Sequence, residues 1–403
     1  MHDVCSEPIH TNPTANDPLS GRGRLVDTTG RWLAQRPPSA ISARFLAKEA
    51  GVHPTFVGQC FTPLSLLFEQ AHNALAERFM GDIEVDDVLM QVWTEPQALA
   101  GHSDYWRAHV HLMLDDIDVH LARDHPVQHL QRAIARHQPR QSSIKGAGLA
   151  AAWWSMQIGV LVFERPLDQG FGVTPANKAR VKRQVHAVID ALIRGRTPRL
   201  QKTSIVTAAE QLPPFGPAEG RQGAEHALLR AAMQLFCERV DVGVSGRELS
   251  KLADVNYGLI HHYFGSKEAV FDQAFLRLHD HYVKDMMSVP SYERSQRMTQ
   301  HESFLRGWAA RELSGSALPS IELKGMRALL QQLIERRGID RRNNMAMAAA
   351  RAQSYAVTAM LLGWTLCRPL LSTALQTDES TLLGYLLAIQ DHILKEKFQP
   401  ANV

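Results

Sequence analysis

Apolar residues along the chain repeat with the spacing of α-helices. Positions i, i+3 and i+4 are apolar in successive segments, whereas alternating runs of β-branched residues, which are typical of strands, are absent. The most apolar segments, 147–163 and 345–366, mix Ala, Gly and Ser with large side chains, a pattern that lets helices approach closely. We predict an all-α protein in which these two segments are either buried core helices or a helix–helix interface between two halves.

A segment of 26 residues occurs twice, at an offset of 203 residues. LAKEAGVHPTFVGQCFTPLSLLFEQA covers 46–71, LSKLADVNYGLIHHYFGSKEAVFDQA covers 249–274, and eight of the 26 positions are identical. Chance would give roughly two identities. The same offset relates the Arg-Pro-Leu sequences that begin at Arg165 and Arg368. The pattern indicates that a whole unit was duplicated, giving a first and a second copy.

Composition supplies the remaining boundaries. The segment 196–223 contains four prolines and three glycines, which interrupt helices and indicate a linker. Residues 1–20 are rich in Pro, Asn, Asp and Thr, and predict a disordered tail. The predicted domains are the tail (1–20), a first helix-turn-helix head (21–80), a helical regulatory domain (84–195), the linker (196–223), a second head (224–283) and a second helical regulatory domain (285–396).

The second head has the pattern of a helix-turn-helix. Ser245 is placed to cap a helix over 246–253, a turn follows at 254–256, and a short helix over 257–263 would enter a major groove. The apolar positions predicted to anchor the motif are Leu249, Leu252, Val255 and Ile260. The residues predicted to face outward are Asn256, Tyr257, Gly258, His261 and His262.

The sequence ADVNYGLIHHYFGSKEAVF in the second head resembles the DNA-binding signature of TetR-family repressors. The resemblance is strong over 224–283 and weak, but in the same register, over 21–80. It implies two tandem units, each with a three-helix head and a helical domain for ligand binding and dimerisation. It also implies release from DNA by a small ligand. The DNA contacts that it implies are Ser245, Arg247, Asn256, Tyr257, Gly258, His261, His262, Tyr263 and Lys267.

The first head departs from this signature where DNA contacts are implied. Gly58, Gln59, Cys60 and Leu64 stand at the positions of His261, His262, Tyr263 and Lys267. Two interpretations stay open: a head that recognises a different half-site, or one that only supports the fold. Charge favours the first, because residues 21–80 carry seven basic and four acidic residues, against six and eight in 224–283. The candidate contacts of the first head are Ser42, Arg44, His53, Thr55 and Gln59.

Bulk composition excludes several classes of protein. The net charge of +3 neither requires nor excludes a polyanionic partner. The four cysteines are far apart without a CxxC pair, which argues against a zinc module or a disulfide framework and fits a reducing cytoplasm. No apolar signal core and no apolar stretch of membrane-spanning length is expected. We therefore predict a cytoplasmic protein without a membrane partner.

No motif points to an enzyme. The chain has no glycine-rich phosphate loop, nucleophile elbow or HExxH sequence, and we expect no catalytic residue, cofactor or metal. One segment, 109–125, spaces histidines and aspartates by four residues, which could hold a metal ion on a helix. In a chain with 19 histidines, a polar helix face is the preferred interpretation of that segment.

The sequence thus favours a transcriptional repressor that acts as a single-chain pseudo-dimer. Its predicted partners are a double-stranded DNA operator and a small, apolar effector of unknown identity. Further homodimerisation is left open. The alternative is a ligand-sensing or protein-interaction module whose DNA binding is vestigial.

Overall fold

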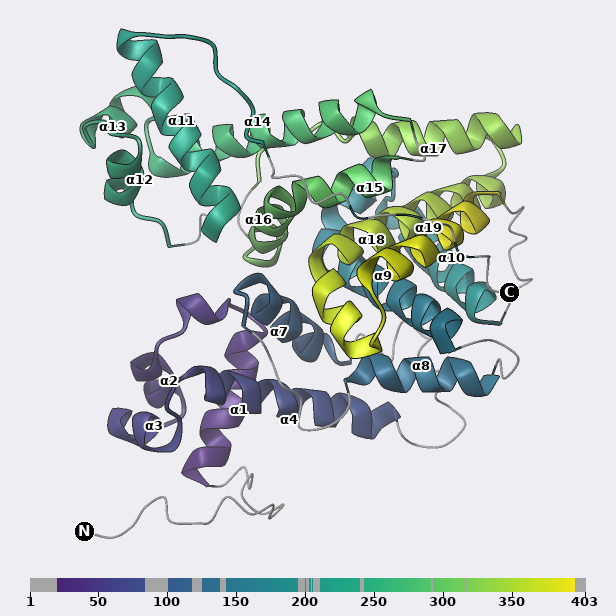
Figure 1. The fold of residues 1–403 in the computed structure, drawn as a ribbon, viewed down its shortest axis with the longest axis horizontal. Coiled ribbons are helices and arrows are strands. Elements are labelled where there is room, and N and C mark those ends of the chain that lie inside the picture. Colours follow the sequence, from purple (N-terminus) through teal and green to yellow (C-terminus); the bar gives the residue numbers. More distant parts are fainter. Residues whose placement is uncertain are drawn as a thin grey trace. The chain divides into compact units, whose positions relative to one another are not determined.

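The structure is a computed structural model of the chain, and all of its regular elements are helical. It describes residues 20–83, 101–117, 125–137, 143–194, 200, 203, 205, 211–239, 243–290, 293–315 and 318–395. No strand occurs among them, which confirms the all-α prediction (Figure 1). Most of the predicted tail and His120 of the 109–125 segment lie outside the described residues. The chain divides into unit 1 (1–129) and unit 2 (130–403).

Unit 1 contains the first head and the long helix that leaves it. Its elements are α1 (Gly21–Leu33), a 3₁₀ turn (Pro38–Ala40), α2 (Ala43–Glu49), α3 (Pro54–Cys60), α4 (Ser65–Ile83) and α7 (Ser103–Leu114), and α8 (Pro126–His137) crosses the boundary to unit 2. Helices α1, α4 and α7 pack against one another, with Leu25, Leu33 and Phe79 fully buried. Such amphipathic helices are stabilised mainly by the burial of their apolar faces.

Three histidines come together in the interior of unit 1. Nε2 of His72 on α4 lies 3.1 Å from Nδ1 of His109 on α7, and the rings of His109 and His125 are 5.4 Å apart. Burial lowers the pKa of His109 to about 4 and the pKa values of His72 and His125 well below 6.5. The His109 side chain thus contacts α4, a helix distant in the sequence. Within the described residues, no group of His, Cys, Asp and Glu side chains could hold a metal ion.

We expect this cluster to make the protein less stable as the pH falls. In the unfolded chain a histidine takes up its proton near pH 6.5, whereas His109 in the folded chain stays neutral down to about pH 4. The contribution of the neutral His109 ring to the unfolding free energy is therefore fully present above pH 6.5. It decreases as the pH falls from 6.5 to 4, by ~3 kcal/mol for His109 alone. Urea unfolding across this range should show a smaller loss for His109→Leu than for the wild type. Equal losses in the two proteins would contradict the prediction.

Unit 2 contains the second head and a large helical domain. Its elements are α9 (Ser143–Gly170), α10 (Pro175–Arg194), α11 (Gly220–Arg239), α12 (Gly246–Leu252), α13 (Gly258–Phe264), α14 (Lys267–Ser288), α15 (Arg294–Met298), a 3₁₀ turn (Thr299–His301), α16 (Glu302–Leu313), α17 (Lys324–Arg337), α18 (Asn344–Leu375) and α19 (Glu379–Lys395). Helix α11 begins at Gly220, inside the segment 196–223 that the sequence indicated as linker. Helix α14 runs from the head formed with α11, α12 and α13 toward the helices α15–α19 (Figure 1).

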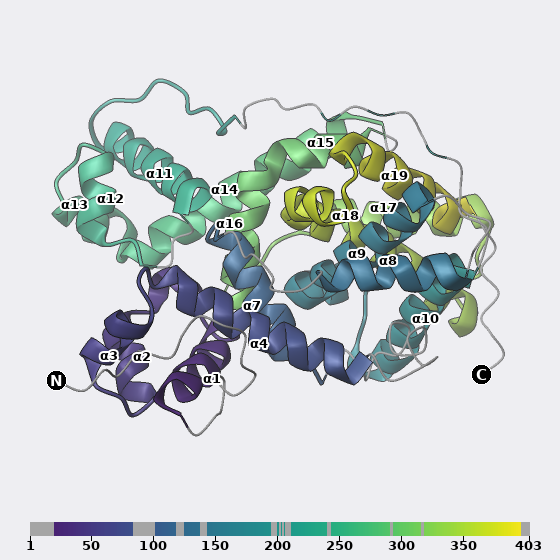
Figure 2. The ribbon, with the colours of Figure 1, turned by 60° about the horizontal axis from the view of Figure 1, so that its bottom comes forward.

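The core of unit 2 is built on the two long helices α9 and α18, which cross in close contact (Figure 2). A Cβ atom added at Gly159 would lie 1.9 Å from the carbonyl oxygen of Ala359, and one added at Gly363 would lie 1.7 Å from that of Ser155. The two backbones therefore touch where neither helix has a side chain. Helix α10 also packs on α18, and α19 packs on both long helices.

The prolines of the two Arg-Pro-Leu sequences lie inside these long helices. Helix α9 continues past Pro166 to Gly170, with non-helical φ and ψ angles at Phe163, and α18 continues past Pro369 to Leu375. The described residues therefore include one helix, Lys145–Gly170, long and apolar enough to cross a membrane, so the expectation that no stretch reaches this length was wrong. Of its most apolar window, 83% is buried, which is equally typical of a core helix.

Candidate functional site

The helix-turn-helix of unit 2 forms from local capping interactions. The hydroxyl of Ser245 accepts a hydrogen bond of 3.1 Å from the backbone N–H of Glu248, which caps α12 as predicted. Asp254 takes a left-handed conformation (φ +52°) in the turn. The side-chain oxygen of Asn256 then accepts 2.8 Å from the N–H of Gly258 and caps α13. Asn256, a predicted base contact, thus also has a structural role.

The predicted apolar anchors are only partly buried. Leu249 and Ile260 are fully buried, but Leu252 is 44% exposed, so its assignment as an anchor was wrong. The buried side chains of α12 are Leu249 and Ser250, so the inward face lies between their directions. At about 100° per residue, Leu252 points roughly 110° away from the centre of that face. A two-turn helix buries too narrow a face to include it.

Helix α13 presents a polar and aromatic face to solvent. Tyr257, Gly258, His261 and His262 are all exposed, as predicted. The hydroxyl of Tyr257 lies 3.3 Å from Nε2 of His261, whose Nδ1 lies 3.1 Å from the carbonyl oxygen of Gly265. These contacts hold both rings on the exposed face. Gly258 carries no side chain there, so another molecule could approach the backbone closely.

Two predicted contacts lie at the edges of this face and are held by the fold. Nζ of Lys267 donates 2.7 Å to the carbonyl oxygen of Val244, just before α12, and lies 3.6 Å from a carboxylate oxygen of Glu268. Tyr263 is half-buried, and the guanidinium of Arg221 lies 5.3 Å from its ring centroid. Arg221 could not be predicted as part of the head, because the predicted linker extends to residue 223 whereas α11 begins at Gly220. The exposed side chains of Ser245 and Arg247 complete the set at the start of α12.

The first head has the same local construction with a different surface. Ser42 caps α2 by accepting 3.2 Å from the N–H of Phe45, and Nδ1 of His53 lies 2.8 Å from the hydroxyl of Thr55 at the start of α3. The five candidate contacts of this head are exposed: Ser42, Arg44, His53, Thr55 and Gln59. The fold of the motif therefore persists although the residues of its second helix have changed.

The basic residues of the first head are not all available to a partner. The guanidinium of Arg22 donates 3.1 Å to the side chain of Gln70 and lies over the ring of Phe61. Nε of Arg24 donates 3.3 Å to the carbonyl oxygen of Ala50. The positive charge that distinguishes this head is thus partly engaged within the fold, while Arg44 on α2 is exposed.

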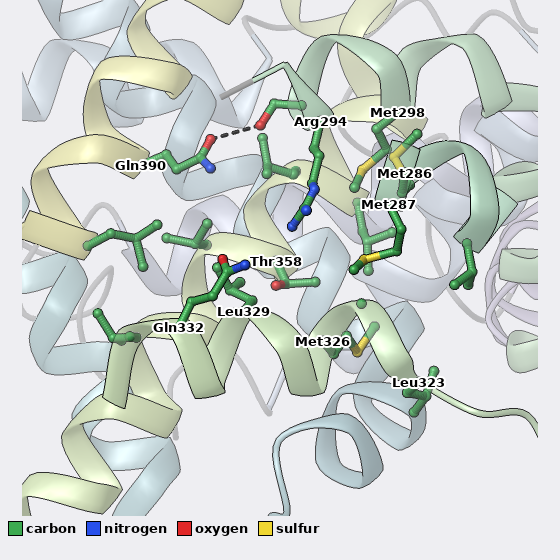
Figure 3. Close-up of a pocket in the computed structure, with 18 of the residues that line it drawn as sticks. Met286, Met287, Arg294, Met298, Leu323, Met326, Leu329, Gln332, Thr358 and Gln390 are labelled. Carbon is green, nitrogen blue, oxygen red and sulfur yellow. Dashed lines mark hydrogen bonds between the residues drawn. The ribbon is translucent and has the colours of Figure 1, made fainter. Parts of the chain in front are cut away.

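Unit 2 also contains a cavity of about 380 Å³, a size typical of small-molecule sites. Its apolar lining includes four methionines and several leucines from α14, α15, α17, α18 and α19, and Figure 3 shows Arg294 extending into it. The labelled lining residues are Met286, Met287, Arg294, Met298, Leu323, Met326, Leu329, Gln332, Thr358 and Gln390. Apart from the expected preference for apolar ligands, this cavity could not be predicted from the sequence, because its walls come from segments far apart in the chain.

Comparison with known proteins identifies the second head. The family model of the bacterial regulatory proteins of the tetR family matches residues 228–274, from α11 into α14. The second head is therefore similar to the DNA-binding domain of that family. Helix α13 and its exposed face lie within the matched residues.

Two relatives of the chain are named as helix-turn-helix transcriptional regulators. An HTH-type transcriptional repressor of Mycobacterium tuberculosis and an HTH-type transcriptional regulator of Mycobacterium bovis are each 25% identical to this chain over 176 residues. The match covers 90% of each relative but only 44% of this chain. With the TetR-family match, these relatives support a DNA-binding transcriptional regulator.

Proposed function

We propose that the protein is a TetR-like transcriptional repressor in which one cytoplasmic chain supplies both halves of the family's dimer. The observation that carries the proposal is the packing of α9 and α10, from the first copy, against α18 and α19, from the second. The last two helices of each copy thus form one four-helix arrangement inside unit 2. Nearly complete relatives that match only 44% of the chain agree with a chain that holds two copies.

The two copies contribute different residues to the contact between them, so two first copies could not make the same contacts. This difference favours pairing of a first and a second copy within one chain. Nζ of Lys182 donates to the hydroxyl of Tyr355, which is fully buried, and lies 3.8 Å from a carboxylate oxygen of Asp168. At the offset of 203 residues, the counterpart of Tyr355 is Ala152 and that of Lys182 is Tyr385. Two first copies brought together would leave the ammonium group of Lys182 without this hydroxyl in a mostly buried place.

The cavity is placed to regulate the second head. Its wall includes His279, Tyr282 and Met286 of α14, the helix that follows directly on α13. A ligand that favours one position of α14 over another would change the fraction of molecules whose head fits DNA. The apolar lining fits the small effector that we expect to release the protein from its operator.

The test is selection of bound fragments from a DNA pool, followed by footprinting and mass measurement of the complex. We expect two unequal half-sites protected by a single 45.0 kDa chain, because the two exposed recognition faces differ in every candidate contact except the Ser and Arg at the start of the first motif helix. A symmetric palindrome bound by two chains would contradict the single-chain proposal. The alternative, a ligand sensor with vestigial DNA binding, requires that no fragment is enriched even at low salt.

A further inference from the structure

We propose that the effector is an anionic amphiphile, with an apolar body and one carboxylate that pairs with Arg294. This proposal rests on the proposed function and names the chemistry of its ligand. The decisive feature is a cationic group that extends into a mostly apolar cavity (Figure 3).

Arg294 begins α15 and points into the cavity, toward Gln332 and Thr358 (Figure 3). Its Nε is buried without a hydrogen-bond partner, and among the described residues its guanidinium makes no ion pair. The neighbouring Arg297, by contrast, pairs with Asp285 at 3.1 Å. Arg294 is half-buried, and its buried Nε atom lacks a hydrogen bond. A carboxylate, which a guanidinium group can bind through two parallel hydrogen bonds, would supply that bond and pair with the positive charge.

The other ionisable groups of the lining reinforce the preference for an anion. Arg336 and Lys395 lie at the exposed edge of the cavity, and the one carboxylate of the lining, Asp391, already accepts 2.6 Å from Nζ of Lys395. Burial lowers the pKa of His279 to about 4, so this residue is neutral at pH 7. A cationic ligand would therefore find no free negative charge in this wall, whereas an anion would find Arg294.

The rest of the wall selects an apolar body without fixing its shape. Met286, Met287, Met298 and Met326 lie together on one side of the cavity into which Arg294 extends (Figure 3). Methionine side chains are unbranched and adapt to irregular ligands. The hydroxyl of Ser295 donates a hydrogen bond of 2.8 Å to the side-chain oxygen of Gln390, so these two groups already have a partner within the wall.

The experiment measures direct binding by titration calorimetry of the full chain with three ten-carbon probes: decanoate, decanol and decylammonium. We expect decanoate to bind about tenfold or more tightly than decanol, because of the charge-assisted hydrogen bonds, and decylammonium to bind weakest. In Arg294→Gln the advantage of decanoate should disappear while decanol binds as in the wild type, which also shows that the variant is folded. Arg342→Gln, an equal change of charge at an exposed residue outside the cavity, should bind like the wild type.

Three results would overturn the proposal: equal binding of decanoate and decanol by the wild type, tighter binding of decylammonium, or no binding of any probe. Because binding is measured without DNA, its outcome is separate from that of the proposed function. Operator binding without decanoate binding would overturn the effector proposal alone. Decanoate binding by a protein that enriches no DNA fragment would overturn the repressor instead.

Discussion

Gly363→Ala is expected to cost the protein ~3 kcal/mol or more of unfolding free energy, the upper range for overpacking of a well-packed core. The added methyl carbon would lie 1.7 Å from the carbonyl oxygen of Ser155 and 2.8 Å from the backbone nitrogen of Gly159. Neither neighbour is the end of a flexible side chain, so α9 and α18 must move apart along their whole contact. Thermal unfolding followed by tryptophan fluorescence would report this directly, because Trp153, Trp154 and Trp364 are buried on these two helices.

The matched control for this substitution is Gly81→Ala. Gly81 is also inside a helix, α4, but an added Cβ would meet nothing within 4 Å. Its replacement should stabilise the protein by up to about 1 kcal/mol, since alanine is the better helix former. A Gly363→Ala protein that unfolds at the temperature of the wild type would show that the two helices are not in backbone contact.

The helices and the caps of the second head could be predicted from sequence because their causes are local. Ser245 caps α12 through a residue three positions away, and the apolar period of α9 and α18 is visible without any partner. Trp153 and Trp364 lie in the two segments predicted to be core or interface helices, and both are buried. Leu252 shows the limit of this reasoning, because a regular apolar spacing does not say how wide a face a two-turn helix buries.

The parts that sequence reasoning missed depend on contacts between distant segments. His109 was grouped with residues of its own helix, but the residue beside it is His72, 37 positions earlier. Arg294 attracted no notice as one arginine among many basic residues. Its side chain stands out only in the folded chain, where apolar residues of α14, α17 and α18 line the cavity around it. The repeat predicted that two copies exist, whereas the complementarity of Lys182 and Tyr355 appears only when the copies are packed together.

Binding to a selected operator is expected to fall ~100-fold in His262→Glu, which places a negative charge on the exposed face of α13 beside the phosphates. The equivalent substitution in the first head is Gln59→Glu, because the two positions are 203 residues apart. We expect a smaller loss there, about tenfold, since the first head keeps exposed Thr55 and Gln59 but has Pro54 and Gly58 at the positions of Tyr257 and His261. Titration of the labelled operator at several salt concentrations measures both.

The matched control adds the same charge outside both heads, as Asn344→Asp at the exposed start of α18, and should bind like the wild type. Footprints separate the heads: His262→Glu should remove protection from one half-site and Gln59→Glu from the other. If Gln59→Glu leaves both affinity and footprint unchanged, the first head supports the fold without touching DNA. The exposed residues of α3 would then be ordinary surface, and one head with a single half-site would carry the whole recognition of the operator.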